Sequence, residues 1–201
     1  MKKRYITISC LLAVTCILLT CAALQRDRRA LAEKLVRLHV VANSDSDFDQ
    51  SVKLQVRDAV LERASTLMNG STDPKAALRN GLPEIQAAAQ SCLSGLRVEA
   101  PVTVTMGKEL FPTRDYDTFS LPSGVYTSLR VIIGEGEGHN WWCVVFPSLC
   151  LPASMEDMKE AAETAGFSDA EIRLITEAGE GYVIKFKTLE LLQKLKNFLF
   201  C

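Results

Sequence analysis

Cys143 is the residue of this chain whose type and surroundings could support covalent chemistry, because a cysteine beside a histidine can act as a nucleophile. The chain has two histidines, His39 and His139, and either would serve if the fold brought it to the thiol. Cys143, however, stands between two tryptophans and two valines in a strand-like run, and no helix begins directly after it to activate the thiol. An exported hydrolase or peptidase using Cys143 with a histidine is therefore the alternative interpretation, and we expect no catalytic residue.

A disulfide is the expected role of Cys143. Cys150 follows seven residues later, and the segment Phe146 to Leu149 would turn the chain back between them. Cys92 and Cys201 are the other cysteines beyond the N-terminal apolar segment, so four thiols allow three full pairings and the sequence does not choose among them. We predict a Cys143–Cys150 disulfide, which requires that this part of the chain folds in an oxidising compartment.

The run from Gly134 to His139 alternates glycines with Glu135, Glu137 and His139. It lacks the lysine of a phosphate-binding loop, and the residues after it have the pattern of a strand rather than the helix of a dinucleotide fingerprint. In an extended conformation the two carboxylates and the imidazole would face one way and could bind a divalent metal. Because glycines hold such side chains loosely and no second histidine lies nearby, we expect no metal site and predict a solvated, acidic hairpin turn.

Three aspartates alternate from Asp45 to Asp49, like the start of a calcium-binding loop. Gln50, however, stands where an EF-hand loop needs glycine, and Val56 stands where it needs glutamate. Helix capping is the better interpretation, because Ser46 or Asp47 can accept hydrogen bonds from the free backbone amides of a following helix. The carboxylates also suit the positive end of that helix.

The N-terminal residues predict export. Met1 to Arg4 form a short basic head, and residues 5–24 carry no charge, a pattern typical of both a bilayer-spanning helix and a secretory signal. The small residues that end Cys21 to Ala23 suit cleavage, whereas the basic residues after them suit a retained anchor, so both interpretations stay open. We expect residues 1–24 to be a signal peptide or anchor, residues 25–152 a signalling domain, and residues 153–201 an extension of that domain.

The composition fits a folded domain and disfavours one class of partner. Of the 201 residues, 48% are apolar and 23% are charged, which is typical of globular chains. The net charge of −1 argues against nucleic acid as a partner, because a basic surface supplies most of the binding energy there. We also expect no cofactor, since no cofactor-binding motif is present.

Hydrophobic periodicity predicts an α+β fold with a mixed, largely antiparallel sheet packed by helices. A buried strand at residues 36–42 is followed by a helix at residues 48–68 with two apolar stripes, the second of which would face either the next helix or a partner. Gly81 and Pro83 would interrupt the following helix, so we expect either a kink or two short helices there. The remaining expected elements are strands at residues 97–106, 125–133 and 140–146, a loop at residues 108–124, a helix beyond Pro152, a hairpin of residues 172–176 and 182–187, and a helix at residues 188–200.

Trp141 and Trp142 would face opposite sides of their strand, since successive strand residues alternate. One of them can enter the core, and the other would cover a helix, a loop or a partner. An exposed tryptophan beside Phe146, Pro147 and Leu149 would be a typical interface anchor. The sequence leaves core packing and partner contact open for both tryptophans.

Three runs of the sequence carry a family resemblance. They are RLHVVANSDSDFDQSVKLQVRDAVL (Arg37 to Leu61), the Leu-Pro-x-Gly-x-Tyr run from Leu121 to Tyr126, and the Gly-Glu-Gly-x-x-Trp-Trp-Cys run from Gly136 to Cys143. In this order they resemble the stage II sporulation protein R family, over about residues 35–152. The resemblance implies a signalling protein made in the forespore and exported into the space between forespore and mother cell. There it would activate a membrane-embedded aspartic protease that cleaves the inactive precursor of the factor sigma-E.

Binding, rather than catalysis, is the function that this resemblance implies. An anchored structural protein of the spore envelope is a further alternative. For each candidate side chain, the alternative to partner contact is a structural role in capping, core packing or hydrogen bonding within the fold. The expected partner-contacting residues are His39, Asn43, Ser44, Asp45, Tyr116, Tyr126, Arg130, Trp141 and Trp142.

Overall fold

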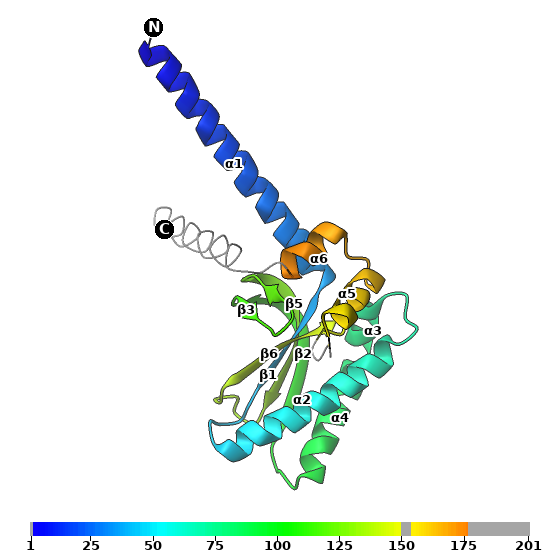
Figure 1. Cartoon of the computed structure of the whole chain (residues 1–201). Coiled ribbons are helices and arrows are strands. Elements are labelled where there is room, and N and C mark those ends of the chain that lie inside the picture. Colours follow the sequence, from blue (N-terminus) through cyan, green and yellow to red (C-terminus); the bar gives the residue numbers. More distant parts are fainter. Residues whose placement is uncertain (1, 150–153, 177–201) are drawn as a thin grey trace.

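The computed structural model describes residues 2–149 and 154–176. Figure 1 shows a long helix, α1 (Lys2–Lys34), that projects from a domain built of a sheet and shorter helices, so the chain is an α+β protein. The elements of the domain, in chain order, are β1 (Val36–Val41), α2 (Asp47–Met68), α3 (Pro74–Asn80), α4 (Leu82–Gly95), β2 (Val102–Phe111), β3 (Arg114–Asp115), β4 (Ser120–Leu121), β5 (Gly124–Ile133), β6 (Asn140–Phe146), α5 (Met155–Thr164) and α6 (Asp169–Thr176).

The four-stranded sheet has the order β2-β5-β1-β6. β1 pairs parallel with β5 and antiparallel with β6, and β2 pairs antiparallel with β5, which confirms a mixed, largely antiparallel sheet. Because β1 separates β5 from β6, the glycine run between these two strands passes over the end of β1. The predicted hairpin turn at Gly134 to His139 is therefore wrong, since it assumed that strands adjacent in sequence also pair.

One face of the sheet is apolar and is covered by α2 and α4, which lie side by side in Figure 1. Leu38 of β1, Val56 of α2 and Ile85 of α4 are fully buried in this first core. The second apolar stripe of α2 is divided between two environments. Met68 packs against the first core, whereas Leu54 is 37% exposed. The buried stripe orients α2 so that its N-terminus lies beside the end of β1.

The helix boundaries follow capping signals in the sequence. Asp73 caps α3 by accepting a hydrogen bond from the backbone N–H of Ala76 at 3.0 Å. The predicted break between two short helices is confirmed, because α3 ends and α4 begins on either side of Gly81. A Cβ atom at Gly81 would lie 2.4 Å from the end of the Leu67 side chain, so this corner packs closely on α2.

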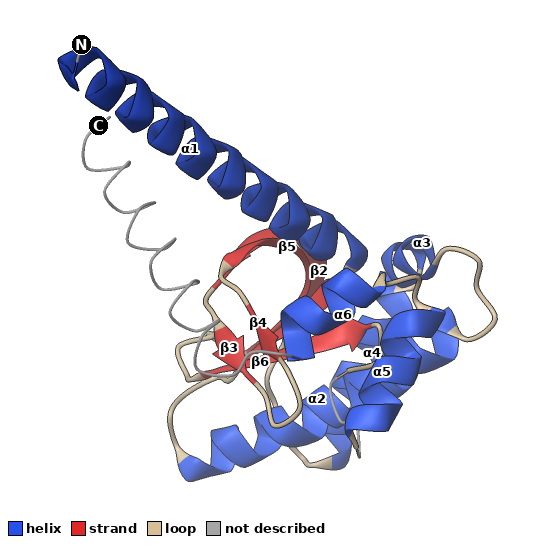
Figure 2. Ribbon diagram, turned by 45° about the horizontal axis from the view of Figure 1, so that its top comes forward, coloured by secondary structure: helices blue, strands red, loops and turns tan. Residues whose placement is uncertain are grey.

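A second core covers one end of the opposite sheet face. It joins the last turn of α1 to the β3–β4 ribbon, α5 and α6, and it includes the fully buried Leu31, Leu35 and Phe111. Lys34 of α1 forms an ion pair with Glu171 of α6 at 2.6 Å. Figures 1 and 2 both show α6 close to this end of α1. The last turn of α1 is therefore an integral part of the domain.

Two predicted elements differ from the structure. The strand expected at residues 97–106 instead begins at Val102 and continues to Phe111, because its whole length pairs with β5, so the predicted loop contains the end of β2 and the β3–β4 ribbon. Residues 172–176, expected as a strand, form the second half of α6. The Glu171 carboxylate accepts a hydrogen bond from the backbone N–H of Ser168 at 2.8 Å and fixes the start of that helix. The expected strand 182–187 and helix 188–200 lie outside the described residues.

Along α1, the side chains of Tyr5, Leu11 and Leu18 are exposed. In the part of the chain that the structure describes, no helix reaches the length and apolar character that a membrane crossing requires. The export or anchor role of residues 5–24 stays a prediction.

Candidate functional site

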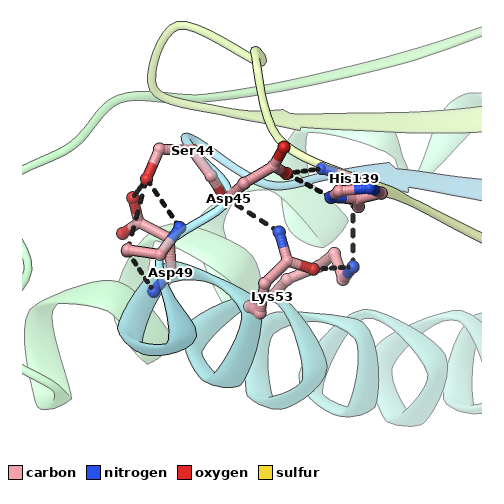
Figure 3. Close-up of polar contacts among 7 residues, drawn as sticks. Ser44, Asp45, Asp49, Lys53 and His139 are labelled. Atoms are coloured by element: carbon pink, nitrogen blue, oxygen red, sulfur yellow. Dashed lines mark hydrogen bonds and ion pairs between the residues drawn. The ribbon is translucent and has the colours of Figure 1, made fainter.

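A surface rim forms where the loop after β1 meets the glycine run, and we define it as residues 42–49 and 134–139 (Figure 3). Ser46 caps α2 by accepting from the backbone N–H of Asp49 at 3.1 Å, which confirms one of its two predicted caps. The Asp49 carboxylate accepts from Ser44 Oγ at 2.6 Å and from Asn43 Nδ2 at 2.9 Å. The hydrogen bond from Ser44, and next that from Asn43, lowers the pKa of Asp49. An ionised carboxylate is thereby held at the positive end of α2.

The glycine run binds this loop mainly through its backbone. The N–H of Glu135 donates to Asn43 Oδ1 at 3.1 Å, and the N–H of Glu137 donates to the Asn43 carbonyl at 3.2 Å. A Cβ atom at Gly134 would lie 2.1 Å from Asn43 Oδ1, and one at Gly138 would lie 2.3 Å from the Ser44 carbonyl oxygen. Gly134 also has a φ of 57°, which disfavours other residues. The glycines are therefore required by the close approach of the two segments rather than by phosphate binding.

Asp45 and His139, whose side chains are both exposed, join the two segments, as Figure 3 shows. The His139 backbone N–H donates to Asp45 Oδ1 at 2.6 Å, and the imidazole Nδ1 contacts the same carboxylate. Below them, Lys53 Nζ donates to the His139 carbonyl at 3.0 Å and to Gln50 Oε1 at 2.5 Å. Lys53 is 5% exposed, and this burial lowers its pKa. The buried ammonium group of Lys53 thus links α2 to the rim through its hydrogen bond to the His139 carbonyl.

The outer surface of the rim combines negative charge with an exposed aromatic ring. Phe48, in the first turn of α2, is 62% exposed. Asp45, Asp47, Glu135 and Glu137, which belong to the same two segments, are also exposed. A large exposed aromatic side chain on a rigid element is a typical interface anchor. Sequence reasoning missed Phe48, although an apolar residue outside the buried stripe of α2 was the available signal.

His39 lies on the sheet face opposite to the first core and is 4% exposed. Its Nδ1 is 2.8 Å from Glu109 Oε1, and its Nε2 is 2.9 Å from Asn140 Oδ1. Its ring stacks on Trp142 with 3.8 Å between ring centroids. Arg130, which is exposed, reaches the Glu109 carboxylate at 4.0 Å. The structure therefore separates His39 from the rim and buries it, with both ring nitrogens and one ring face in contact with neighbouring side chains.

Arg37, Phe111, Tyr116 and Tyr126 form a group that we name the Arg37 centre. The Arg37 guanidinium is fully buried, lies 4.2 Å and 5.0 Å from the centroids of Phe111 and Tyr126, and donates from Nη2 to the Tyr116 hydroxyl at 3.0 Å. Arg37 Nε and Nη1 have no hydrogen-bond partner among the described residues. Burial raises the pKa of Tyr126 to about 12, and its hydroxyl donates to the Pro122 carbonyl at 2.7 Å. The predicted contact residue Tyr126 is thus a core residue here.

Trp141 and Trp142 lie on opposite faces of β6, as predicted, and both are half-buried. Trp141 packs against the first core with the Arg57 guanidinium 4.4 Å from its ring centroid. Trp142 packs against the second core and Phe111. Of the nine predicted contact residues, the structure brings Asn43, Ser44 and Asp45 together in the rim. Of the other six, five lie in or beside the two cores, and Arg130 is exposed on β5.

Cys143 is 1% exposed and lies in the first core. Successive strand residues point to opposite faces, so Cys143 and the His39–Trp142 stack lie on different sides of the sheet. The other histidine, His139, pairs with Asp45. Within the described residues, then, no imidazole lies beside the Cys143 sulfur. The predicted partner Cys150 lies outside the described residues, so the pairing stays a prediction; the described free cysteines are Cys16 and Cys92.

Metal binding has no support in the described residues, where no group of three or more histidine, cysteine, aspartate and glutamate side chains could hold an ion. Glu135, Glu137 and His139 do not converge, because the His139 ring turns to Asp45.

The family model described as Stage II sporulation protein R (spore_II_R) matches residues 32–156, a range that contains both segments of the rim. The chain belongs to this family. Stage II sporulation protein R of Bacillus subtilis (strain 168) is 37% identical over 124 residues, which cover 60% of this chain and 55% of that protein. The chain thus matches little more than half the length of this relative. No solved structure matches the chain.

Two of the runs that carry the family resemblance lie together in the structure. The runs Arg37 to Leu61 and Gly136 to Cys143, which carried the resemblance in the sequence, meet in the rim. The match ends at Glu156, in the first turn of α5, so most of α5 and all of α6 lie beyond the family region.

Proposed function

We propose that this chain is an exported sporulation signalling protein that binds and activates a membrane-embedded aspartic protease, leading to cleavage of pro-sigma-E in the mother cell. Family membership supports the sporulation role. In this proposal the chain acts in the space between forespore and mother cell, and it acts by contact rather than by covalent chemistry. No cofactor takes part.

The rim is the observation that carries this proposal. Its two segments belong to or adjoin two of the three runs that carry the family resemblance, and backbone hydrogen bonds fix one segment to the other. A fixed backbone presents the outward side chains with little loss of entropy on binding. The rim is therefore suited to contact another protein.

The chemistry of the rim indicates what it would contact. Phe48 supplies an apolar anchor, and the four exposed carboxylates of the two rim segments supply negative charge. A complementary partner surface has an apolar pocket flanked by lysine or arginine side chains. In this proposal that surface belongs to the extracytoplasmic part of the protease.

A complementation experiment tests this proposal. Cells that lack the native protein receive the wild-type chain, Phe48→Ala or Leu110→Ala, and pro-sigma-E cleavage is followed by immunoblot. Leu110 is 71% exposed and lies on β2, outside the rim, so it is a matched control. We expect Phe48→Ala to reduce cleavage about tenfold or more, as for a loss at an interface anchor. Leu110→Ala should behave as wild type.

Photo-crosslinking gives a second measurement at the same positions. A photoreactive amino acid at position 48 should crosslink to the protease, whereas the same group at position 110 should not. If Phe48→Ala supports normal cleavage and position 48 forms no crosslink, the rim is not the activating surface.

The hydrolase alternative makes a different prediction for the cysteines. Cys143→Ser and Cys150→Ser, made separately, should cause equal losses if the two thiols form a disulfide. A nucleophilic role predicts loss from Cys143→Ser alone. An envelope structural protein predicts that pro-sigma-E cleavage proceeds normally in cells lacking the chain.

A further inference from the structure

A surface groove lies at the opposite end of α2 from the rim. It has a volume of about 730 Å³ and runs between the C-terminal end of α2, the end of β6 and one side of α5. Figures 1 and 2 show α5 beside this end of α2. A helix of 22 residues is about 33 Å long, so the groove and the rim are separate surfaces.

Part of the groove lining is apolar, and we name this part the floor. It is formed by Met68 from α2, by Phe146 and Pro147 at the end of β6, and by Ala161 and Ala165 from α5. Met68, Phe146, Ala161 and Ala165 are only partly buried, so their apolar atoms still face solvent. Methionine is adaptable, and the two alanines leave room for larger side chains to insert. Such a floor fits the apolar face of an amphipathic helix.

The wall formed by α5 is acidic. Asp157 and Glu160 line the groove, and within the described part of the chain no lysine, arginine or histidine lines it. Asp157 accepts a hydrogen bond from Ser154 Oγ at 2.9 Å, whereas Glu160 is exposed. The remaining polar residues of the lining are neutral: Ser65, Asn69, Ser71, Thr72, Ser148 and Thr164. An apolar floor beside carboxylates is complementary to a segment with leucines on one face and lysine or arginine at its border.

We infer that this groove binds a basic amphipathic helix of a partner protein. The α5 wall lies beyond the family match, which ends at Glu156, so the charged half of the groove is an addition to the family region. This inference does not depend on the proposed function of the rim. A variant that blocks the groove leaves the rim intact, and a rim variant leaves the groove intact.

Peptide binding to the full-length protein tests the groove. The probe is a fluorescent helical peptide of about five turns, made of leucine and lysine with the leucines on one face. A peptide of the same composition in scrambled order is the control for unspecific attraction to an acidic protein. Affinity is measured by fluorescence anisotropy, and we expect the amphipathic peptide to bind at least about tenfold more tightly.

Two charge reversals on α5 form a matched pair. Glu160 lines the groove, whereas Glu163 is exposed on the same helix and does not line it. Glu160→Lys should weaken peptide binding about tenfold, and Glu163→Lys, with the same change in net charge, should change it less than about twofold. Equal effects of the two substitutions would overturn the inference.

Filling the floor gives an independent test. Ala161→Phe places a ring in the groove and should abolish binding, while the thermal unfolding midpoint shows whether the domain remains folded. Normal binding by a folded Ala161→Phe variant would also overturn the inference. So would a crosslink from the bound peptide to Phe48 instead of Met68, because the peptide would then occupy the rim.

Discussion

The rim and the Arg37 centre both depend on polar side chains, but the hydrogen-bonding groups of these side chains find different partners in the two regions. In the rim, Asn43 and Asp45 are bonded to backbone amides of the facing segment, and the outer side chains stay in solvent. In the Arg37 centre a fully buried guanidinium lies among aromatic rings, and among the described residues it donates one hydrogen bond, to the Tyr116 hydroxyl. The geometry of the rim is therefore determined by the close approach of two backbone segments. The geometry of the Arg37 centre is determined by the packing of aromatic side chains around the guanidinium.

This difference indicates which substitutions each region tolerates. A rim held together by its backbone should accept changes to outward side chains and reject changes that separate the two segments. A buried charge without a carboxylate partner is costly, because it loses hydration without regaining it in an ion pair. The Arg37 centre should therefore tolerate loss of the charge better than loss of its remaining hydrogen bond.

The largest expected effect is that of Gly138→Ala in the rim. Its Cβ would lie 2.3 Å from the Ser44 carbonyl oxygen, so the backbones must separate. We expect the free energy of unfolding to fall by about 3 kcal/mol, as for a severe steric insertion, measured by urea denaturation. Gly95→Ala is the control, because nothing lies within 4 Å of its Cβ and alanine favours helices. Equal effects of the two substitutions would contradict close backbone approach in the rim.

Tyr116→Phe should have the next largest effect. It removes the hydroxyl that accepts from Arg37 Nη2 and donates to the Trp142 carbonyl. We expect a loss of about 1–2 kcal/mol in unfolding free energy, since a buried donor is left unpaired. The matching control is Tyr5→Phe, at a tyrosine that is 69% exposed, which should unfold as the wild type does. No loss in Tyr116→Phe would mean that Arg37 finds another partner.

Asp49 predicts a pH dependence of the rim. Because its pKa is lower in the folded chain than in the unfolded chain, the unfolded chain binds more protons in acid. The resulting stabilisation is complete above the unfolded pKa of about 4 and is lost as the pH falls through the folded pKa. Thermal unfolding between about pH 2 and pH 6 should show a steeper acid loss for wild type than for Asp49→Asn. If the unfolding temperatures of wild type and Asp49→Asn fell in parallel with pH, the pKa of Asp49 would be the same in the folded and unfolded chains.

Arg37→Met should have the smallest effect. Methionine keeps much of the packing against Phe111 and Tyr126 and removes a charge that lacks an ion-pair partner in the described residues. We expect the unfolding free energy to change by no more than about 1 kcal/mol in either direction. On this background Tyr116→Phe should cost less than in the wild type, and a double-mutant cycle measures the difference. A loss comparable with that of Gly138→Ala would show that the charge itself holds the second core.

Elements with strong local signals were predicted closely. The apolar run of β1, the Ser46 cap of α2 and the break at Gly81 all depend on residues near one another in sequence. The start of α6 also carried a local signal, Ser168 followed three residues later by Glu171, which is a capping pattern that the prediction of a strand there overlooked.

The pairing of distant segments could not be predicted from local pattern. Nothing in the sequence near Gly134 indicates that β1 lies between the two flanking strands, so the run was interpreted as a hairpin. The same long-range pairing decides which candidate residues meet. It brings Asn43 and Asp45 to the glycine run, and it buries His39 between Glu109 and Asn140.

The junction between α1 and the sheet has a mechanical consequence. Leu35 alone separates α1 from β1, and the last turn of α1 is held by Leu31 and by the Lys34–Glu171 pair. A helix of 33 residues is a stiff rod about 50 Å long, joined here without a flexible hinge. If the N-terminal end of α1 is held in place, the position and orientation of the domain are therefore fixed as well. The domain can then contact only those partners that lie at the corresponding distance and in the corresponding direction.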